Sequence, residues 1–261
     1  MAVLIPRKPW PPGFPEVVVH GELRARNGHA AYTAAKSGDA EAARALADDL
    51  LSADETQRLG YFLGGRQPIL VAVTADEVTG YNAIPDAMAQ VLGACLGLEA
   101  EYGSIVQANK VGHTKADGWH RLVTPAEFAG VVVPGASYFL VDDHVGFGGT
   151  LANLRGFIEH WGGNVIGMTA LTETRAARRI SVHLQTLDML YARHGSEPEE
   201  FWHRRLGHGL HCLTDVEAGY LCRVGSVAAI KDRMAQATEQ ARGRGLSAAG
   251  DTLEAAVSGS G

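Results

Sequence analysis

The sequence predicts an α/β fold with an open, mainly parallel sheet and flanking helices, extended by helical additions at the N- and C-terminal ends. Two observations predict it. Short apolar runs, PILVAVTA from Pro68 and SYFLV from Ser137, are typical of strands that are buried on both faces. Runs of this kind are followed by a turn and then by apolar residues at helical spacing, and this order repeats along the middle of the chain.

The composition argues against several classes of protein. About 46% of the 261 residues are hydrophobic and 20% are charged, as in globular proteins and unlike disordered chains. No apolar run approaches the roughly 18 residues that span a bilayer, and proline interrupts the opening MAVLIPRKPWPP, so we expect a cytoplasmic protein without a signal peptide. The net charge of −6 argues against nucleic acid as a partner. The three cysteines lack CxxC spacing, so neither a disulfide framework nor a cysteine zinc site is expected.

Residues 1–65 are expected to form a proline-rich arm followed by a helical prologue. Because proline fixes φ and lacks an N–H, residues 1–20 are predicted to be extended, either lying on the body or free in solution. Asp39 is the predicted N-cap of a helix that begins at the next residue. Ser52 followed by Glu55 three positions later predicts a capping box and a second helix.

Residues 66–172 are expected to form the α/β core. The predicted strands are PILVAVTA, EYGSIVQA, SYFLV and NVIGMTAL, and the predicted helices are IPDAMAQVLGACLGL and TLANLRGFIEHWGG. Strands that alternate with helices favour a parallel sheet.

Residues 173–246 carry no strong strand pattern and are expected to form a helical region. In its first stretch, Ile180, Leu184, Leu187 and Tyr191 are predicted to share one helix face. The pairs Ser196–Glu199 and Thr214–Glu217 are predicted capping boxes, and Ser226 is a predicted N-cap. Residues 247–261 are small and polar and are expected to form a flexible tail. His203, His208 and His211 lie close together in this region, but without a metal-site pattern we expect them to line a surface or a hood.

The most informative segment is YFLVDDHVGFGGTL, residues 138–151. A buried strand ends in two adjacent carboxylates, Asp142 and Asp143, and glycines then precede Thr150 and a helix. Backbone N–H groups at a helix N-terminus bind anions such as phosphate. The carboxylates suit ligand hydroxyls or a hard divalent metal. A sugar phosphate satisfies all of these groups, whereas the simpler alternative is a buried strand that ends in an ordinary capping turn.

This pattern resembles the phosphoribosyl pyrophosphate (PRPP) motif of type I phosphoribosyltransferases, and the resemblance covers about residues 66–172. It implies that the two aspartates bind the ribose hydroxyls and, through PRPP, Mg²⁺. The glycine-rich loop that ends at Thr150 would hold the 5′-phosphate. The implied PRPP-binding residues are Asp142, Asp143, Gly146, Phe147, Gly148, Gly149 and Thr150.

The motif departs from the family at three positions. Phe147 stands where many members have a threonine, so one hydroxyl donor is lost, and His144 replaces a usual aliphatic residue. Gly146 stands where purine-salvage members carry an aspartate, which disfavours a hypoxanthine–guanine type of mechanism.

Two further segments would complete a transferase site. By position the family's pyrophosphate loop corresponds to Ala75, Asp76, Glu77, Val78, Thr79 and Gly80, although its two acids are equally typical of a solvated turn. Residues 109–121 follow the second strand, where orotate-type members carry a mobile catalytic loop. Lys110, His113 and Lys115 are the candidate catalytic residues, with Lys110 first, because fixed cations stabilise departing pyrophosphate. An exposed loop with lysines is the alternative.

The resemblance therefore implies a Mg²⁺-dependent phosphoribosyltransferase that moves 5-phosphoribosyl from PRPP to a nitrogen or other nucleophile. The acceptor is a small molecule that the sequence does not identify, and its hood would come from residues 1–65 or 173–246. A homodimer is expected by family analogy alone. Two alternatives stay open, a non-catalytic PRPP sensor and a sugar-phosphate hydrolase with the same phosphate cradle.

Overall fold

A five-stranded parallel sheet forms the centre of the computed structural model, which describes residues 5–77, 80–101, 103–111, 117–174, 177–246 and 248. The strand order is β1-β9-β8-β2-β5, and every neighbouring pair is parallel. The strands are β1 Val18–Val19, β2 Ile69–Ala72, β5 Ala100–Glu101, β8 Ser137–Val145 and β9 Asn164–Glu173. The predicted fold class is confirmed.

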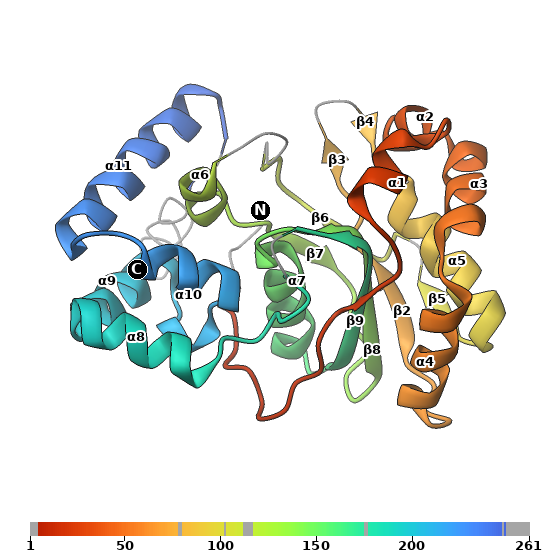
Figure 1. Cartoon of the computed structure of the whole chain (residues 1–261), viewed down its shortest axis with the longest axis horizontal. Coiled ribbons are helices and arrows are strands. Elements are labelled where there is room, and N and C mark those ends of the chain that lie inside the picture. Colours follow the sequence, from red (N-terminus) through yellow and green to blue (C-terminus); the bar gives the residue numbers. More distant parts are fainter. Residues whose placement is uncertain are drawn as a thin grey trace.

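Three helices cover one face of this sheet (Figure 1): α3 Ala40–Leu50, α4 Ala53–Leu63 and α5 Ile84–Leu96. Asp39 and Ser52 cap α3 and α4 as predicted, since each side chain accepts a hydrogen bond from a first-turn N–H. The short helices α1 Leu23–Gly28 and α2 Tyr32–Lys36 precede them. Helix α7, Gly149–His160, packs on the other face.

Residues 100–107 form two short strands rather than the single strand that the sequence predicts. β5 joins the central sheet, whereas β6, Ile105–Gln107, pairs antiparallel with β7, Phe128–Gly130. Gly103 lies between the two strands with φ of 70°, a left-handed conformation that interrupts an extended strand. A second small antiparallel pair, β3 Asp76–Glu77 and β4 Gly80–Tyr81, follows β2.

The C-terminal helices form a separate cluster at the opposite end of the molecule from α3–α5 (Figure 1). They pack together with α6 around their own apolar core, which includes Trp119, Trp202 and Leu221. The helices are α6 Gly118–Val123, α8 Leu184–His194, α9 Glu197–Leu206, the 3-10 turn η1 Leu210–Cys212, α10 Asp215–Cys222 and α11 Val227–Gly243.

Two details of this region differ from the sequence predictions. α8 begins only at Leu184, and the side chain of that residue is 78% exposed rather than aligned with buried Leu187. Ser196 makes no capping hydrogen bond, because its φ of −87° and ψ of −10° are helical rather than extended as at Ser52, and the Glu199 carboxylate accepts from the Tyr191 hydroxyl and the Leu210 N–H. Thr214–Glu217 does form a complete capping box, and Ser226 caps α11.

The N-terminal arm, residues 5–16, lies on the body and leads into β1 at the sheet edge. The Arg155 guanidinium of α7 donates to the carbonyls of Lys8 and Pro9 and stacks on Trp10, with 4.6 Å between the guanidinium carbon and the ring centroid. The Trp10 indole N–H donates to the Leu213 carbonyl at 2.7 Å. The arm therefore ties the C-terminal cluster to the sheet domain. No helix of the described residues is long and apolar enough to cross a membrane.

Candidate functional site

Asp142 and Asp143 lie at the carboxyl end of β8, where ligands bind in open α/β sheets. Both side chains are buried, Asp142 at 8% exposure and Asp143 at 5%. Because successive residues of a strand point to opposite faces, the two carboxylates have different surroundings.

Asp143 lies in a buried polar network with residues of the N-terminal helices. Its Oδ2 is 3.3 Å from Arg26 Nη1 and 3.3 Å from Lys36 Nζ, and its Oδ1 accepts from Asn82 at 3.1 Å. Burial alone would raise the pKa of Asp143, but the Lys36 ammonium and the Arg26 guanidinium outweigh it and hold this pKa below its ordinary value. Asp143 is therefore ionised and fully engaged at neutral pH.

Asp142 instead lines a hollow together with the turn that follows β8. No cation of the described residues lies within ion-pair distance of its carboxylate, whose Oδ1 accepts from the Asp143 N–H at 2.8 Å. Burial, together with the charge of Asp143, raises the pKa of Asp142 to about 8. The group is protonated at neutral pH and is able to donate as well as accept a hydrogen bond.

The glycine-rich turn leads from β8 into α7 and presents unused hydrogen-bond donors. Gly148 is the N-cap residue with φ of 77°, and it has no side chain to cap the helix. Among the described residues, no group accepts a hydrogen bond from the N–H of Gly148, Gly149, Thr150 or Leu151. Together with the helix dipole, four free donors at one helix N-terminus form an anion-binding arrangement.

The hollow in front of this turn has a volume of about 410 Å³, with the open solvent at its mouth included. Arg121 of α6 also lines it, and its guanidinium carbon lies 6.0 Å from the centre of the Phe147 ring. The Phe147 ring packs edge-on against Tyr220 of α10, with 5.3 Å between centroids. Phe147 and Arg121 thus give the hollow that Asp142 lines an aromatic and a cationic part.

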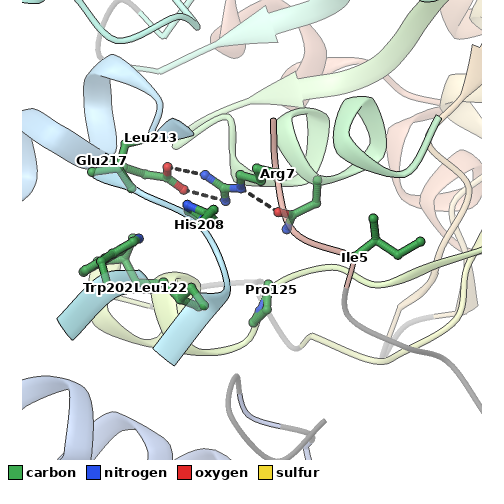
Figure 2. A pocket seen from close by; sticks show the side chains of 10 residues that line it. Ile5, Arg7, Leu122, Pro125, Trp202, His208, Leu213 and Glu217 are labelled. Carbon is green, nitrogen blue, oxygen red and sulfur yellow. Dashed lines mark hydrogen bonds and ion pairs between the residues drawn. The ribbon is translucent and has the colours of Figure 1, made fainter. Parts of the chain in front are cut away.

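Glu217 of α10 forms another part of the wall. Its carboxylate takes two hydrogen bonds from the Arg7 guanidinium, at 2.6 and 3.0 Å, and Arg7 also donates to Asn153 of α7 (Figure 2). Oε1 of Glu217 lies 2.8 Å from the position that a Cβ on Gly149 would occupy. A buried carboxylate and its counter-charge therefore lie directly beside the free N–H groups of the turn.

Glu217 also borders a second cavity, between the arm, α6 and the C-terminal cluster (Figure 2). His208 lines this cavity, and burial followed by the charge of Arg7 lowers its pKa to about 3. His203 and His211 are exposed, and no group of three or more metal-ligating side chains that could hold a metal ion occurs among the described residues.

His144 follows the two acids and has no free ring nitrogen. Nδ1 lies 2.9 Å from the Thr172 hydroxyl and Nε2 lies 2.6 Å from the Thr174 hydroxyl. Burial, followed by the charge of Arg26, lowers its pKa to about 4, so the imidazole is neutral. Both ring nitrogens therefore join the end of β8 to the end of β9.

The other predicted site residues are only partly described. Lys110 is exposed after β6 and does not line the hollow. His113 and Lys115, like Val78 and Thr79, lie outside the described residues. Ala75 to Glu77 and Gly80 belong to the β3–β4 hairpin and its approach.

Several residues at the site were missed by the sequence reasoning: Arg7, Arg26, Lys36, Asn82, Thr214, Glu217 and Tyr220. Only the Thr214–Glu217 capping box carried a signal, and it predicts a helix start without indicating what that helix touches.

No family model matches the chain. The protein named TraN of Escherichia coli is 42% identical over 238 residues, which make up 91% of this chain and 53% of that protein. An uncharacterised protein of Haemophilus influenzae is 40% identical over 152 residues, 58% of this chain and 34% of its own length. The chain therefore spans about half the length, or less, of these curated relatives.

Solved structures similar to this chain include phosphoribosyltransferases. A crystal structure of adenine phosphoribosyltransferase aligns with a TM-score of 0.33 and 14% identity, covering 53% of this chain and 71% of that chain. Orotate phosphoribosyltransferase of Mycobacterium tuberculosis aligns with a TM-score of 0.28 and 13% identity, covering 60% and 78%.

Proposed function

We propose that the hollow at the carboxyl end of β8 binds PRPP and that the protein transfers its 5-phosphoribosyl group to a small nucleophile, releasing pyrophosphate. One observation carries the proposal. Four unbonded N–H groups at the N-terminus of α7 and the buried carboxyl of Asp142 line the same hollow. A phosphate that is attached to a sugar with free hydroxyls matches both groups of donors and acceptors.

In this proposal the groups of the hollow bind different parts of PRPP, and cations from outside it act on the leaving group. The N–H groups of residues 148–151 hold the 5′-phosphate, and Asp142 exchanges hydrogen bonds with a ribose hydroxyl. The bond from C1 to the pyrophosphate oxygen breaks, its electron pair leaves with pyrophosphate, and the nucleophile's lone pair forms the new bond at C1 with inversion. Lys110, with His113 and Lys115, remains the proposed source of positive charge for the leaving group.

Asp143 takes a positioning role in this proposal, because its carboxylate is already engaged by Arg26, Lys36 and Asn82. Mg²⁺ suits the oxygen chemistry of the site but finds no dedicated set of protein ligands among the described residues. The ion would arrive bound to the diphosphate, where it would neutralise charge on the leaving group, and Asp142 would be a carboxyl of the hollow available to it.

A PRPP-binding protein without transferase activity is the second candidate. The observation that favours it is Phe147, whose ring packs against Tyr220 at the position where many type I members have a threonine hydroxyl donor. A weakened phosphate site of this kind would suit sensing more than turnover.

Calorimetry with PRPP tests the binding step. We expect tighter binding in Mg²⁺ than in EDTA, competition by ribose 5-phosphate, and weaker binding by Asp142→Asn. Glu159→Gln is the matched control, because Glu159 pairs with Arg155 along α7 and does not line the hollow. No heat and no thermal shift with either ligand would overturn the proposal.

Product analysis then separates the candidate functions. Pyrophosphate release in the presence of PRPP and a panel of nucleobases and other small nucleophiles would support the transferase. Binding without any product would favour the sensor, and inorganic phosphate as the product would indicate a sugar-phosphate hydrolase.

A further inference from the structure

The N-terminus of α10 contacts the glycine-rich turn through the side chain of its N-cap residue. Thr214 Oγ1 donates a hydrogen bond to the Phe147 carbonyl at 2.5 Å. The same oxygen accepts from the Glu217 N–H at 3.2 Å, and Glu217 Oε2 accepts from the Thr214 N–H at 2.9 Å. One hydroxyl therefore caps α10 and holds a peptide group of the turn.

This hydrogen bond fixes the direction of the next N–H. In a trans peptide the carbonyl and the following N–H point to opposite sides. Because the Phe147 carbonyl points at Thr214, the Gly148 N–H points away from it, to a side where no described group accepts a hydrogen bond. The donor is held in place without being used.

Packing reinforces this orientation. A Cβ on Gly148 would lie 3.1 Å from Thr214 Cγ2 and 3.3 Å from the Ile180 side chain, so the turn rests closely on both residues. The ring of Phe147 is held by the same helix, through its edge contact with Tyr220. Both the backbone and the side chain of Phe147 are thus placed by α10.

We propose that Thr214 is a positioning residue for anion binding, which aims the Gly148 N–H at the phosphate through its hydrogen bond to the Phe147 carbonyl. The inference rests on the proposed function and extends the site to the C-terminal cluster. That cluster becomes part of the phosphate site rather than only a hood over it.

The test uses variants that separate capping from the hydrogen bond to the turn. Thr214→Gly keeps an accepted N-cap residue, at a cost of a few tenths of a kcal/mol, but has no hydroxyl. Thr214→Ser keeps the hydroxyl. Ser226→Gly is the matched control, because Ser226 caps α11 through an equivalent hydrogen bond to the Ala229 N–H and lies outside the hollow.

Inorganic phosphate and then PRPP with Mg²⁺ are titrated into ¹⁵N-labelled full-length protein, and the Gly148 amide signal is followed. We expect Thr214→Gly to bind both about tenfold more weakly and to lose the phosphate-induced shift of Gly148, as for the loss of one charge-assisted hydrogen bond. Thr214→Ser is expected within about twofold of the parent. Ser226→Gly should match the parent.

Each other outcome has a distinct meaning. If the parent binds neither phosphate nor PRPP, the proposed function fails first. If the parent binds and Thr214→Gly binds equally well, the proposed function stands and the positioning role is overturned. Equal weakening in Thr214→Gly and Ser226→Gly would also overturn it, because the effect would then follow from helix stability alone.

Discussion

Asp142 and Asp143 are adjacent and chemically identical, but the two faces of β8 at its carboxyl end shift their pKa values in opposite directions. On the basic side, Asp143 lies within 3.3 Å of both Arg26 and Lys36, which keep its pKa low. On the turn side, Asp142 meets no described cation at ion-pair distance, and burial next to Asp143 raises its pKa to about 8. The side chain chemistry is the same, so the difference comes entirely from the surroundings.

This contrast indicates that Asp142 and Asp143 have different roles. A carboxylate that is satisfied by two cations and an amide contributes to the fold, and removing it leaves buried charge behind. A carboxyl that is held neutral beside free N–H donors is able both to donate and to accept a hydrogen bond, and pKa values pushed apart within a pair are typical of functional sites. The predictions below break or sharpen this contrast, from the largest expected effect to the smallest.

Asp143→Asn is expected to lower the free energy of unfolding by about 4 kcal/mol, because Arg26 and Lys36 lose their shared buried carboxylate. Urea denaturation of the purified variant measures the change. This differs from what the strand-end motif alone suggests, namely an exposed carboxylate whose replacement leaves the fold intact. A loss within about 0.5 kcal/mol would mean that the network does not hold the two cations.

Asp142→Asn is expected to become more stable than the parent as pH rises. The folded pKa of Asp142, about 8, lies above its ordinary value, so its stabilising effect is complete below about pH 4 and is lost as pH rises towards 8. The gain should reach up to about 1.4 kcal/mol per pH unit between pH 5 and 7. Denaturation of both proteins at pH 5, 6 and 7 measures it, and parallel curves would place the pKa of Asp142 near its ordinary value.

Glu217→Gln is expected to cost about 2 kcal/mol, because Arg7 keeps a hydrogen-bonding partner but loses its buried counter-charge. Phosphate should restore part of this stability, because an anion at the turn replaces the missing charge. Thermal melts with and without inorganic phosphate measure both effects. Glu159→Gln provides the comparison, since its Arg155 partner lies away from the turn and should gain nothing from phosphate.

Lys110→Ala is expected to change the free energy of unfolding by less than about 0.5 kcal/mol, because the side chain is exposed. If Lys110 stabilises departing pyrophosphate, kcat should fall on the order of 10²-fold, with less effect on PRPP binding. Steady-state kinetics beside calorimetry separates the two. An unchanged kcat would assign the leaving group to other residues.

Local signals in the sequence predict much of the fold. Asp39 and Ser52 mark the starts of α3 and α4, and the apolar run before Asp142 predicts β8, because caps and burial depend on residues close in the chain. The same logic fails at Ser196, whose backbone is helical rather than extended, while the Glu199 carboxylate accepts hydrogen bonds from Tyr191 and Leu210. A capping-box pattern in the sequence does not show which distant groups hydrogen-bond to its glutamate.

The candidate site is predictable only along the strand and turn. Asp142 and the free N–H groups follow from consecutive residues, and the motif identifies them. Asp143 is bound by Arg26, which lies 117 residues earlier in the chain, and Glu217 is bound by Arg7, which lies 210 residues earlier. Such pairings depend on how the chain folds back, which the spacing of residues does not encode.

The contact between Arg7 and Glu217 also sets how late in synthesis the candidate site can finish folding. Docking the arm needs a partner 210 residues later in the chain, and β1 pairs with a strand about 150 residues away, so these are among the last contacts to form. A nascent chain can assemble the β2–β8–β9 layer on the ribosome well before α10 emerges. Until then the turn after β8 lacks both Thr214 and the Glu217–Arg7 pair, and we expect ribosome-bound chains that stop before Thr214 to bind phosphate at the turn at least about tenfold more weakly than the full chain.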